Sequence, residues 1–106
     1  MENLYHAIRF TPVTKFLDEL PTGDKAKIVA GVSKLEQGDF KSSYVKTLRG
    51  QIRELIVKQY RVIFFIHEHS IFLVCAFRKE SKKTPRGEIE YAERVYTMFI
   101  RNQQNI

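Results

Sequence analysis

The sequence contains a single cysteine, Cys75, among its 106 residues. One thiol cannot form an intramolecular disulfide and cannot supply a zinc site built from several thiolates, so both kinds of cross-link are excluded. Because Cys75 lies inside an apolar run, we expect it to be an inert core thiol rather than a nucleophile. The longest strongly apolar stretch, Val62 to Ile66, is far too short to cross a bilayer.

Other chemical signatures are equally scarce. The sequence has no glycine-rich loop of the kind that cradles phosphates. His67 and His69 flank a glutamate in a predicted turn, and turn histidines without a third ligand are mostly plain surface residues. The first residues are charged and lack an apolar segment, so we predict no signal peptide and a cytoplasmic protein. We therefore expect no metal, no cofactor and no contact with a membrane.

The composition is that of a small folded protein. Hydrophobic residues make up 43% of the chain, which includes eight phenylalanines and five tyrosines. This composition argues against disorder, and 106 residues leave no room for a second core. We predict one domain over residues 1–106.

The net charge of +6 is concentrated in the middle of the chain. Residues 41–87 contain eleven lysines and arginines against three glutamates, a net charge of +8, whereas the segments before and after each have a net charge of −1. Such a concentrated positive field attracts polyanions and speeds their capture. A solvated basic face that only maintains solubility is the alternative explanation at this point.

The first 40 residues predict a short strand followed by a helical hairpin. Leu4–Phe10 has strand character, and Thr11-Pro12 is a typical helix start, with a capping hydroxyl followed by proline. Pro21 ends this helix, and a second helix begins at the next residue and stops at Gly38. The apolar stripe that we expect the second helix to bury consists of Ala26, Val29, Val32 and Leu35.

From residue 44 onward the hydrophobic period becomes that of strands. The four predicted strands are Tyr44–Leu48, Ile52–Val57, Tyr60–Ile66 and Ile71–Phe77. Short connections between them indicate an antiparallel meander. Thr84-Pro85 repeats the helix-start signature and precedes an amphipathic helix, whose apolar face consists of Ile89, Ala92, Val95, Tyr96 and Phe99. The predicted class is α+β, with the helices packed on one face of the sheet.

The predicted strand register brings two arginines together. The first hairpin places Arg61 opposite Ile56, and the second places it opposite Ala76, so that Arg78 lies diagonally beside Arg61 on the same face. Two guanidiniums over one face suit a phosphodiester, because each can bind it through two hydrogen bonds. Arg53 falls on the opposite face. The alternative is an edge arginine that covers the core with its stem, and in either case we expect the exposed Arg61 guanidinium to add little to stability.

Three segments of the sequence resemble the RelE-superfamily toxins of the phage-derived HigB-like branch. They are FLDELPTGDKAKIVAGVSKLE, YVKTLRGQIRELIVKQYRVIFFI and AFRKESKKTPRGEIEYAERV, which together span most of the chain. The last two are similar to the family pattern of an "EL" strand, a "YRV" strand and an "F-x-KK…KTP…EI" passage into the final helix. The resemblance implies a RelE-like fold and a metal-independent, ribosome-dependent mRNA endoribonuclease that is encoded beside an antitoxin.

The resemblance also implies a site built from arginine and lysine. The predicted catalytic residues are Arg61, Arg78, Lys79 and Lys82, and the predicted RNA-binding residues are Lys46, Arg49, Lys58, Lys83 and Arg86. The two arginines would stabilise the charge that develops on the phosphorus, and Lys79 or Lys82 would move protons. Tyr91 and Tyr96 are possible helpers, although packing of an amphipathic helix explains them as well.

One position departs from the family pattern. The family strand commonly has the sequence E-L-R, whereas this chain has Ile56 in place of the arginine, opposite Arg61. A non-catalytic RNA- or ribosome-binding module therefore remains an alternative function, as does a domain whose basic face binds an acidic protein. The expected partners are mRNA on the ribosome and a cognate antitoxin of the helix-turn-helix type, with operator DNA bound only through the antitoxin.

Overall fold

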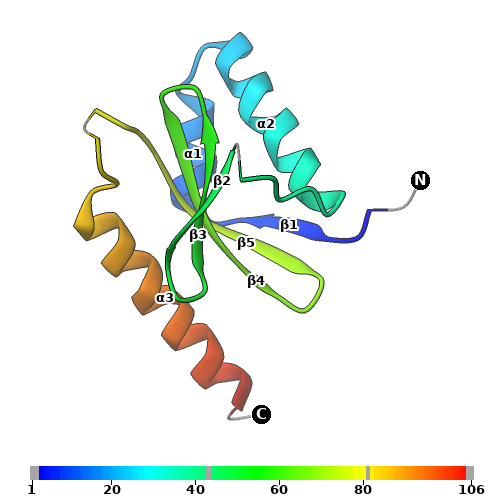
Figure 1. The fold of residues 1–106 in the computed structure, drawn as a ribbon, viewed down its shortest axis with the longest axis vertical. Coiled ribbons are helices and arrows are strands. Elements are labelled where there is room, and N and C mark those ends of the chain that lie inside the picture. Colours follow the sequence, from blue (N-terminus) through cyan, green and yellow to red (C-terminus); the bar gives the residue numbers. More distant parts are fainter. Residues whose placement is uncertain (1–2, 43, 81, 105–106) are drawn as a thin grey trace.

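The computed structural model describes residues 3–42, 44–80 and 82–104 (Figure 1). Its helices and strands are, in chain order, β1 (His6–Arg9), α1 (Thr11–Asp18), α2 (Thr22–Glu36), β2 (Val45–Arg49), β3 (Ile52–Val57), β4 (Tyr60–His67), β5 (Ser70–Arg78) and α3 (Arg86–Gln104). The predicted α+β class and order of elements are confirmed. Among the described residues, no helix combines the length and the apolar character needed to span a membrane.

The strands form one sheet in the order β1-β5-β4-β3-β2. Strands β2 to β5 make the predicted antiparallel meander, and β1 pairs in parallel with β5 at the sheet edge. Two-residue turns at Lys58-Gln59 and Glu68-His69 close the β3–β4 and β4–β5 hairpins. The first residue of each turn has a positive φ, 54° at Lys58 and 56° at Glu68, as tight hairpin turns often require.

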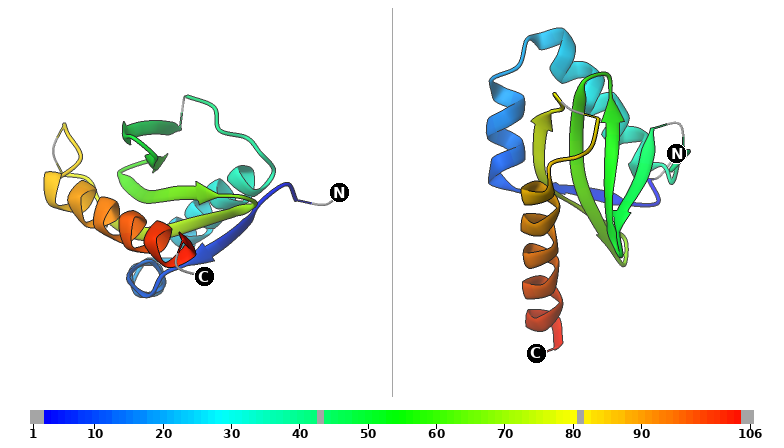
Figure 2. Two further views of the ribbon diagram at one scale, coloured as in Figure 1. Left: turned by 90° about the horizontal axis from the view of Figure 1, so that it is seen from below. Right: turned by 60° about the vertical axis from the view of Figure 1, so that its left-hand side comes forward.

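Helices cover both faces of the sheet, which corrects the prediction that they share one face. Val62 and Phe64 of β4 pack in one apolar cluster with residues of α1 and α2, whereas Ile63 and Phe65 pack in another with α3. We call these the α1/α2 face and the α3 face. In the right-hand view of Figure 2, α2 lies behind the strands, and the segment that leads into α3 passes in front of them. The prediction failed because the meander buries apolar side chains at consecutive positions, so both faces need cover.

The predicted helix-start signal at Thr11 is only partly right. The helix does begin there with proline in its first turn, but the residue at the N-cap is Phe10, and no side chain caps the helix. The end of α2 is confirmed: Gln37 is its C-cap, and Gly38 follows with φ of +83°, a conformation that L side chains rarely adopt.

The predicted buried stripe of α2 is partly right, because Leu35 is buried and Val32 packs against the same apolar cluster. Ile28 and Leu35 are the buried residues of this helix, whereas Ala26 is exposed. Gly31 lies on the buried side, where an added Cβ would come within 3.2 Å of Val57 Cγ2. The absence of a side chain at Gly31 therefore lets α2 approach β3 closely.

Candidate functional site

A β-bulge in β5 separates the two arginines that the sequence analysis placed together. The hairpin starts in the predicted register, with Ile66 opposite Ile71, but the pairing shifts by one residue at Val74. Beyond the bulge Arg61 lies opposite Phe77 rather than Ala76, and Arg78 lies opposite Tyr60. Because successive side chains point to opposite faces, Arg61 lies on the α3 face and Arg78 on the α1/α2 face. The prediction that they share a face is wrong.

The other half of the predicted register is confirmed. Ile56 lies opposite Arg61 across the β3–β4 hairpin, and Arg53 lies on the opposite face, where its guanidinium is 5.9 Å from the centre of the Phe40 ring. Ile56, which stands where the family pattern has arginine, is therefore the residue opposite Arg61, as predicted.

Arg61 is held inside the protein and is not an exposed guanidinium. Its side chain is 13% exposed, and its Nη1 donates hydrogen bonds to the carbonyl oxygens of Lys58 and Tyr60, both at 2.8 Å. Its Nε lies 3.8 Å from Oε1 of Glu54, whose side chain is 1% exposed. Arg61 thus braces the β3–β4 turn and balances a buried carboxylate.

Glu54 is a residue that the sequence analysis missed as part of the site. Its Oε2 accepts a hydrogen bond of 2.6 Å from the hydroxyl of Thr84, while Oε1 and Arg61 Nε make no hydrogen bond within the part of the chain that the structure describes. Thr84 therefore attaches the end of the basic loop, residues 79–85, to β3. The sequence signal for this role was that Glu54 stands between Ile52 and Ile56, at a position where the alternation of the strand predicts an apolar residue.

The tip of the β3–β4 hairpin, residues 57–60, gathers four of the predicted cations. Lys58 forms the turn, and Arg61 is bonded to its carbonyl. Arg78 ends β5 directly opposite Tyr60, and the backbone N–H of Lys79 donates a 2.7 Å hydrogen bond to the carbonyl of Gln59. The basic loop is thus attached at both ends, to the hairpin tip through Lys79 and to β3 through Thr84. Lys82 and Lys83 are exposed within it.

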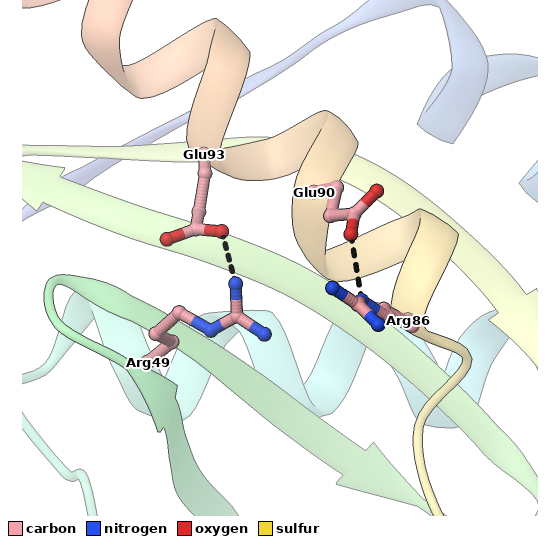
Figure 3. Close-up of polar contacts among 4 residues, drawn as sticks. All are labelled: Arg49, Arg86, Glu90 and Glu93. Carbon is pink, nitrogen blue, oxygen red and sulfur yellow. Dashed lines mark hydrogen bonds and ion pairs between the residues drawn. The ribbon is translucent and has the colours of Figure 1, made fainter.

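The remaining predicted RNA-binding residues lie farther from the tip or are already paired. Arg49 is at the β2–β3 turn, the other end of β3, and its Nη1 is 2.7 Å from Glu93 of α3 (Figure 3). Arg86 begins α3 and forms an ion pair of 2.8 Å with Glu90, one helical turn away (Figure 3). Lys46 is exposed on β2, directly across from Glu54.

Tyr60 connects the tip to α2. Its hydroxyl donates a 2.6 Å hydrogen bond to Oδ2 of Asp24. This bond is the main cause that raises the pKa of Tyr60, and burial is the second. The tyrosines proposed as helpers on α3 have packing contacts: Tyr91 and Tyr96 pack against the apolar cluster of the α3 face. Cys75 is buried in the same cluster, which confirms the expected core position, and burial strongly raises the pKa of its thiol.

No cluster of three or more histidine, cysteine or carboxylate side chains that could hold a metal occurs among residues 3–42, 44–80 and 82–104. The His67 ring packs edge-on against the Phe99 ring, with 5.1 Å between the ring centroids. The described site offers fixed positive charge and hydrogen bonds.

Comparison with known protein families identifies the chain. The family model described as "Phage derived protein Gp49-like" matches residues 15–97, which include both core faces and the whole hairpin tip. This chain belongs to the Gp49-like family.

Curated relatives of this Gp49-like protein include the probable endoribonuclease HigB1 from two strains of Mycobacterium tuberculosis, each 32% identical over 82 residues. The match covers 74% of this chain and 66% of the length of those relatives, just under two thirds. The fold is also shared with RelE proteins. An archaeal RelE, solved in a RelE-RelB complex from Pyrococcus horikoshii, superposes with a TM-score of 0.65 at 18% identity, over 76% of this chain and 99% of that one.

The isolated E. coli RelE toxin gives a TM-score of 0.62 at 12% identity, over 86% of this chain and 98% of that one. The predicted RelE-like fold is thereby confirmed for this Gp49-like chain, as is the family resemblance.

Proposed function

We propose that this protein is the toxin of a toxin–antitoxin pair and that it cleaves mRNA on the ribosome without a metal ion. The observation that carries the proposal is the gathering of four cations at one hairpin tip in a chain related to a probable endoribonuclease. A fixed cluster of positive charge is suited to a phosphodiester. The proposal implies a cytoplasmic protein, because that is where mRNA is translated.

In the proposed reaction the 2′-hydroxyl of the RNA is the nucleophile. Its oxygen forms a bond to the adjacent phosphorus and loses its proton, while the bond from phosphorus to the 5′-oxygen breaks and that oxygen gains a proton. The products are a 2′,3′-cyclic phosphate and a 5′-hydroxyl. Arg61 and Arg78 would stabilise the extra negative charge from the two sides of the hairpin tip. Lys79 and Lys82, on the loop beside it, would carry the protons.

Substrate chemistry tests this mechanism directly. Translating ribosomes are programmed with mRNA carrying either a normal or a 2′-deoxy nucleotide at the scissile position, and 5′ ends are mapped. Cleavage is expected only with the 2′-hydroxyl, and it should persist in excess EDTA when the integrity of the ribosome is maintained by other means. Cleavage of the 2′-deoxy mRNA at a normal rate would mean that water attacks, and the roles given to the four cations would have to be abandoned.

A second candidate is a non-catalytic RNA- or ribosome-binding module. The observation that favours it is the environment of Arg61, whose Nη1 is occupied by two carbonyls and whose charge is balanced by Glu54. Ile56 in place of the family arginine points the same way. Steeply salt-dependent binding to ribosomes with no new mRNA 5′ ends would establish this function in place of the first.

We further propose that a cognate antitoxin with a helix-turn-helix domain neutralises the toxin and carries any contact with operator DNA. The likeness to an archaeal RelE solved together with RelB supports a protein partner. Co-expression with a short open reading frame beside the gene should relieve growth arrest. Arrest that no neighbouring frame relieves would contradict this part of the proposal.

A further inference from the structure

A second group of cations lies on the side of the hairpin tip that faces α2. It arises from the bulge at Val74, which turns Arg78 toward the α1/α2 face, beside Tyr60. The Tyr60 hydroxyl binds Asp24 of α2, so this helix is fixed against the tip at that point. The cation positions on this side are therefore set by backbone pairing between strands and by one short hydrogen bond.

Lys27 brings another charge to the same place. It follows Asp24 by three residues in α2, so the two side chains lie on neighbouring positions of one helix face. Lys27 and Val57 line one groove between α2 and β3, and Lys58 is the next residue after Val57. Lys27 lies outside the basic segment 41–87, and no role was predicted for it from the sequence.

In this group the positive charges of Lys27 and Lys58 face one carboxylate, that of Asp24. The Lys58 side chain lowers the pKa of Lys27, first because it can donate a hydrogen bond to the neutral Lys27 amine and then because it carries a like charge. The Asp24 carboxylate opposes this change. The Asp24 carboxylate already accepts the Tyr60 hydroxyl at Oδ2. Lys25, by contrast, points to a different partner and forms a 3.4 Å ion pair with Asp18. Two neighbouring ammonium groups are stabilised when an anion binds between them.

We propose that Lys27 and Lys58, beside Arg78, form a phosphate-binding subsite for the RNA backbone on the α2 side of the β3–β4 turn. The subsite rests on the proposed RNA-directed function and extends it to a second face of the sheet. The cations continue through Lys79, which is bonded to the turn, into the basic loop. A polyanion with regularly spaced phosphates can follow such a band around the tip, which favours RNA over a compact acidic ligand.

The subsite is tested by the salt dependence of binding to a 2′-O-methyl RNA oligonucleotide, which cannot be cleaved through its 2′-oxygen. Each phosphate contact to single-stranded RNA contributes a slope of about −0.7 to the plot of log affinity against log salt. Lys27→Gln should flatten the slope by about 0.7 between 50 and 200 mM salt, and the double variant Lys27→Gln/Lys58→Gln by about 1.4. Lys27→Arg, which keeps the charge, should retain the wild-type slope.

Lys25→Gln is the matched control, because it removes the same charge from the same helix on a different face. It should change the slope far less than Lys27→Gln does. Equal slopes for these two variants would overturn the subsite. A Lys27→Gln protein that binds the oligonucleotide normally but loses affinity for polyglutamate would also overturn it, and would assign the cluster to an acidic protein.

The outcomes for the subsite and for the proposed function can be separated. If wild-type protein cleaves natural mRNA but Lys27→Gln leaves the slope unchanged, the function stands and the subsite fails. If Lys27→Gln flattens the slope but wild-type protein cleaves nothing, the subsite stands and the catalytic function fails. Absence of any wild-type binding to the oligonucleotide at 50 mM salt would overturn the subsite.

Discussion

Replacing Arg61 with alanine should destabilise the protein, contrary to the expectation from sequence that its guanidinium is exposed. The substitution leaves the Glu54 carboxylate buried with the Thr84 hydroxyl as its hydrogen-bond partner. It also removes both hydrogen bonds that close the β3–β4 turn onto the Arg61 side chain. Arg61→Ala therefore removes the positive charge opposite a buried carboxylate and two hydrogen bonds to the turn, rather than an exposed charge.

The magnitude follows from burial. Removing one partner of a buried ion pair typically costs about 3–5 kcal/mol. Because the side chain of Arg61 is 13% exposed and its Nε is 3.8 Å from Glu54 Oε1, we take the lower end of that range, about 3 kcal/mol. For a domain of this size, such a loss lowers the melting temperature by roughly 12–20 °C.

The assay is urea unfolding followed by circular dichroism, with thermal melting alongside. Arg86→Ala is the matched control, because Arg86 also pairs with a glutamate but has a side chain that is 85% exposed. An exposed pair is worth less than about 1 kcal/mol, so the control should melt near the wild-type temperature. Adding Glu54→Gln to Arg61→Ala should recover part of the stability, because the neutral amide removes the uncompensated charge.

The reasoning is refuted if Arg61→Ala and Arg86→Ala unfold at the same urea concentration. It is also refuted if Glu54→Gln worsens the Arg61→Ala variant. This result matters for function as well. Loss of growth arrest in Arg61→Ala identifies a catalytic role only if the variant is shown to be folded at the assay temperature.

Three further predictions concern other parts of the fold. Cys75 should fail to react with a thiol reagent in native protein at pH 8 and react fully in urea, because burial raises its pKa; fast native reaction would contradict its packing. The raised pKa of Tyr60 implies stability that is present below pH ~10 and lost as pH rises through the folded-state value. In a spectrophotometric titration, Tyr60→Phe should therefore have one fewer phenol that ionises above the ordinary tyrosine pKa than the wild-type protein. An unchanged number of such phenols would contradict the hydrogen bond between Tyr60 and Asp24. Gly38→Ala should lower stability by about 1–2 kcal/mol because of the positive φ, measured by urea unfolding; a neutral effect would show that the C-terminus of α2 adopts another conformation.

Local patterns in the sequence determined much of this protein. The strand and helix order, the two hairpin turns and the stop at Gly38 follow from periodicity and turn residues, and each lies where it was predicted. The concentration of charge in residues 41–87 and the family resemblance also come from the sequence alone. These features depend on neighbours in the chain, so one sequence is enough to reveal them.

Tertiary structure decided how the cations are arranged. The bulge at Val74 is hidden in the sequence because Leu73, Val74 and Cys75 are all apolar, so an extra residue does not disturb the hydrophobic pattern. One shifted residue moves Arg78 to the other face. Likewise, the Glu54–Arg61 pair depends on a diagonal contact across two strands, which no spacing along the chain records. The sequence determined which charges the protein has, and the packing of strands and helices decided which of them are exposed and which face each occupies.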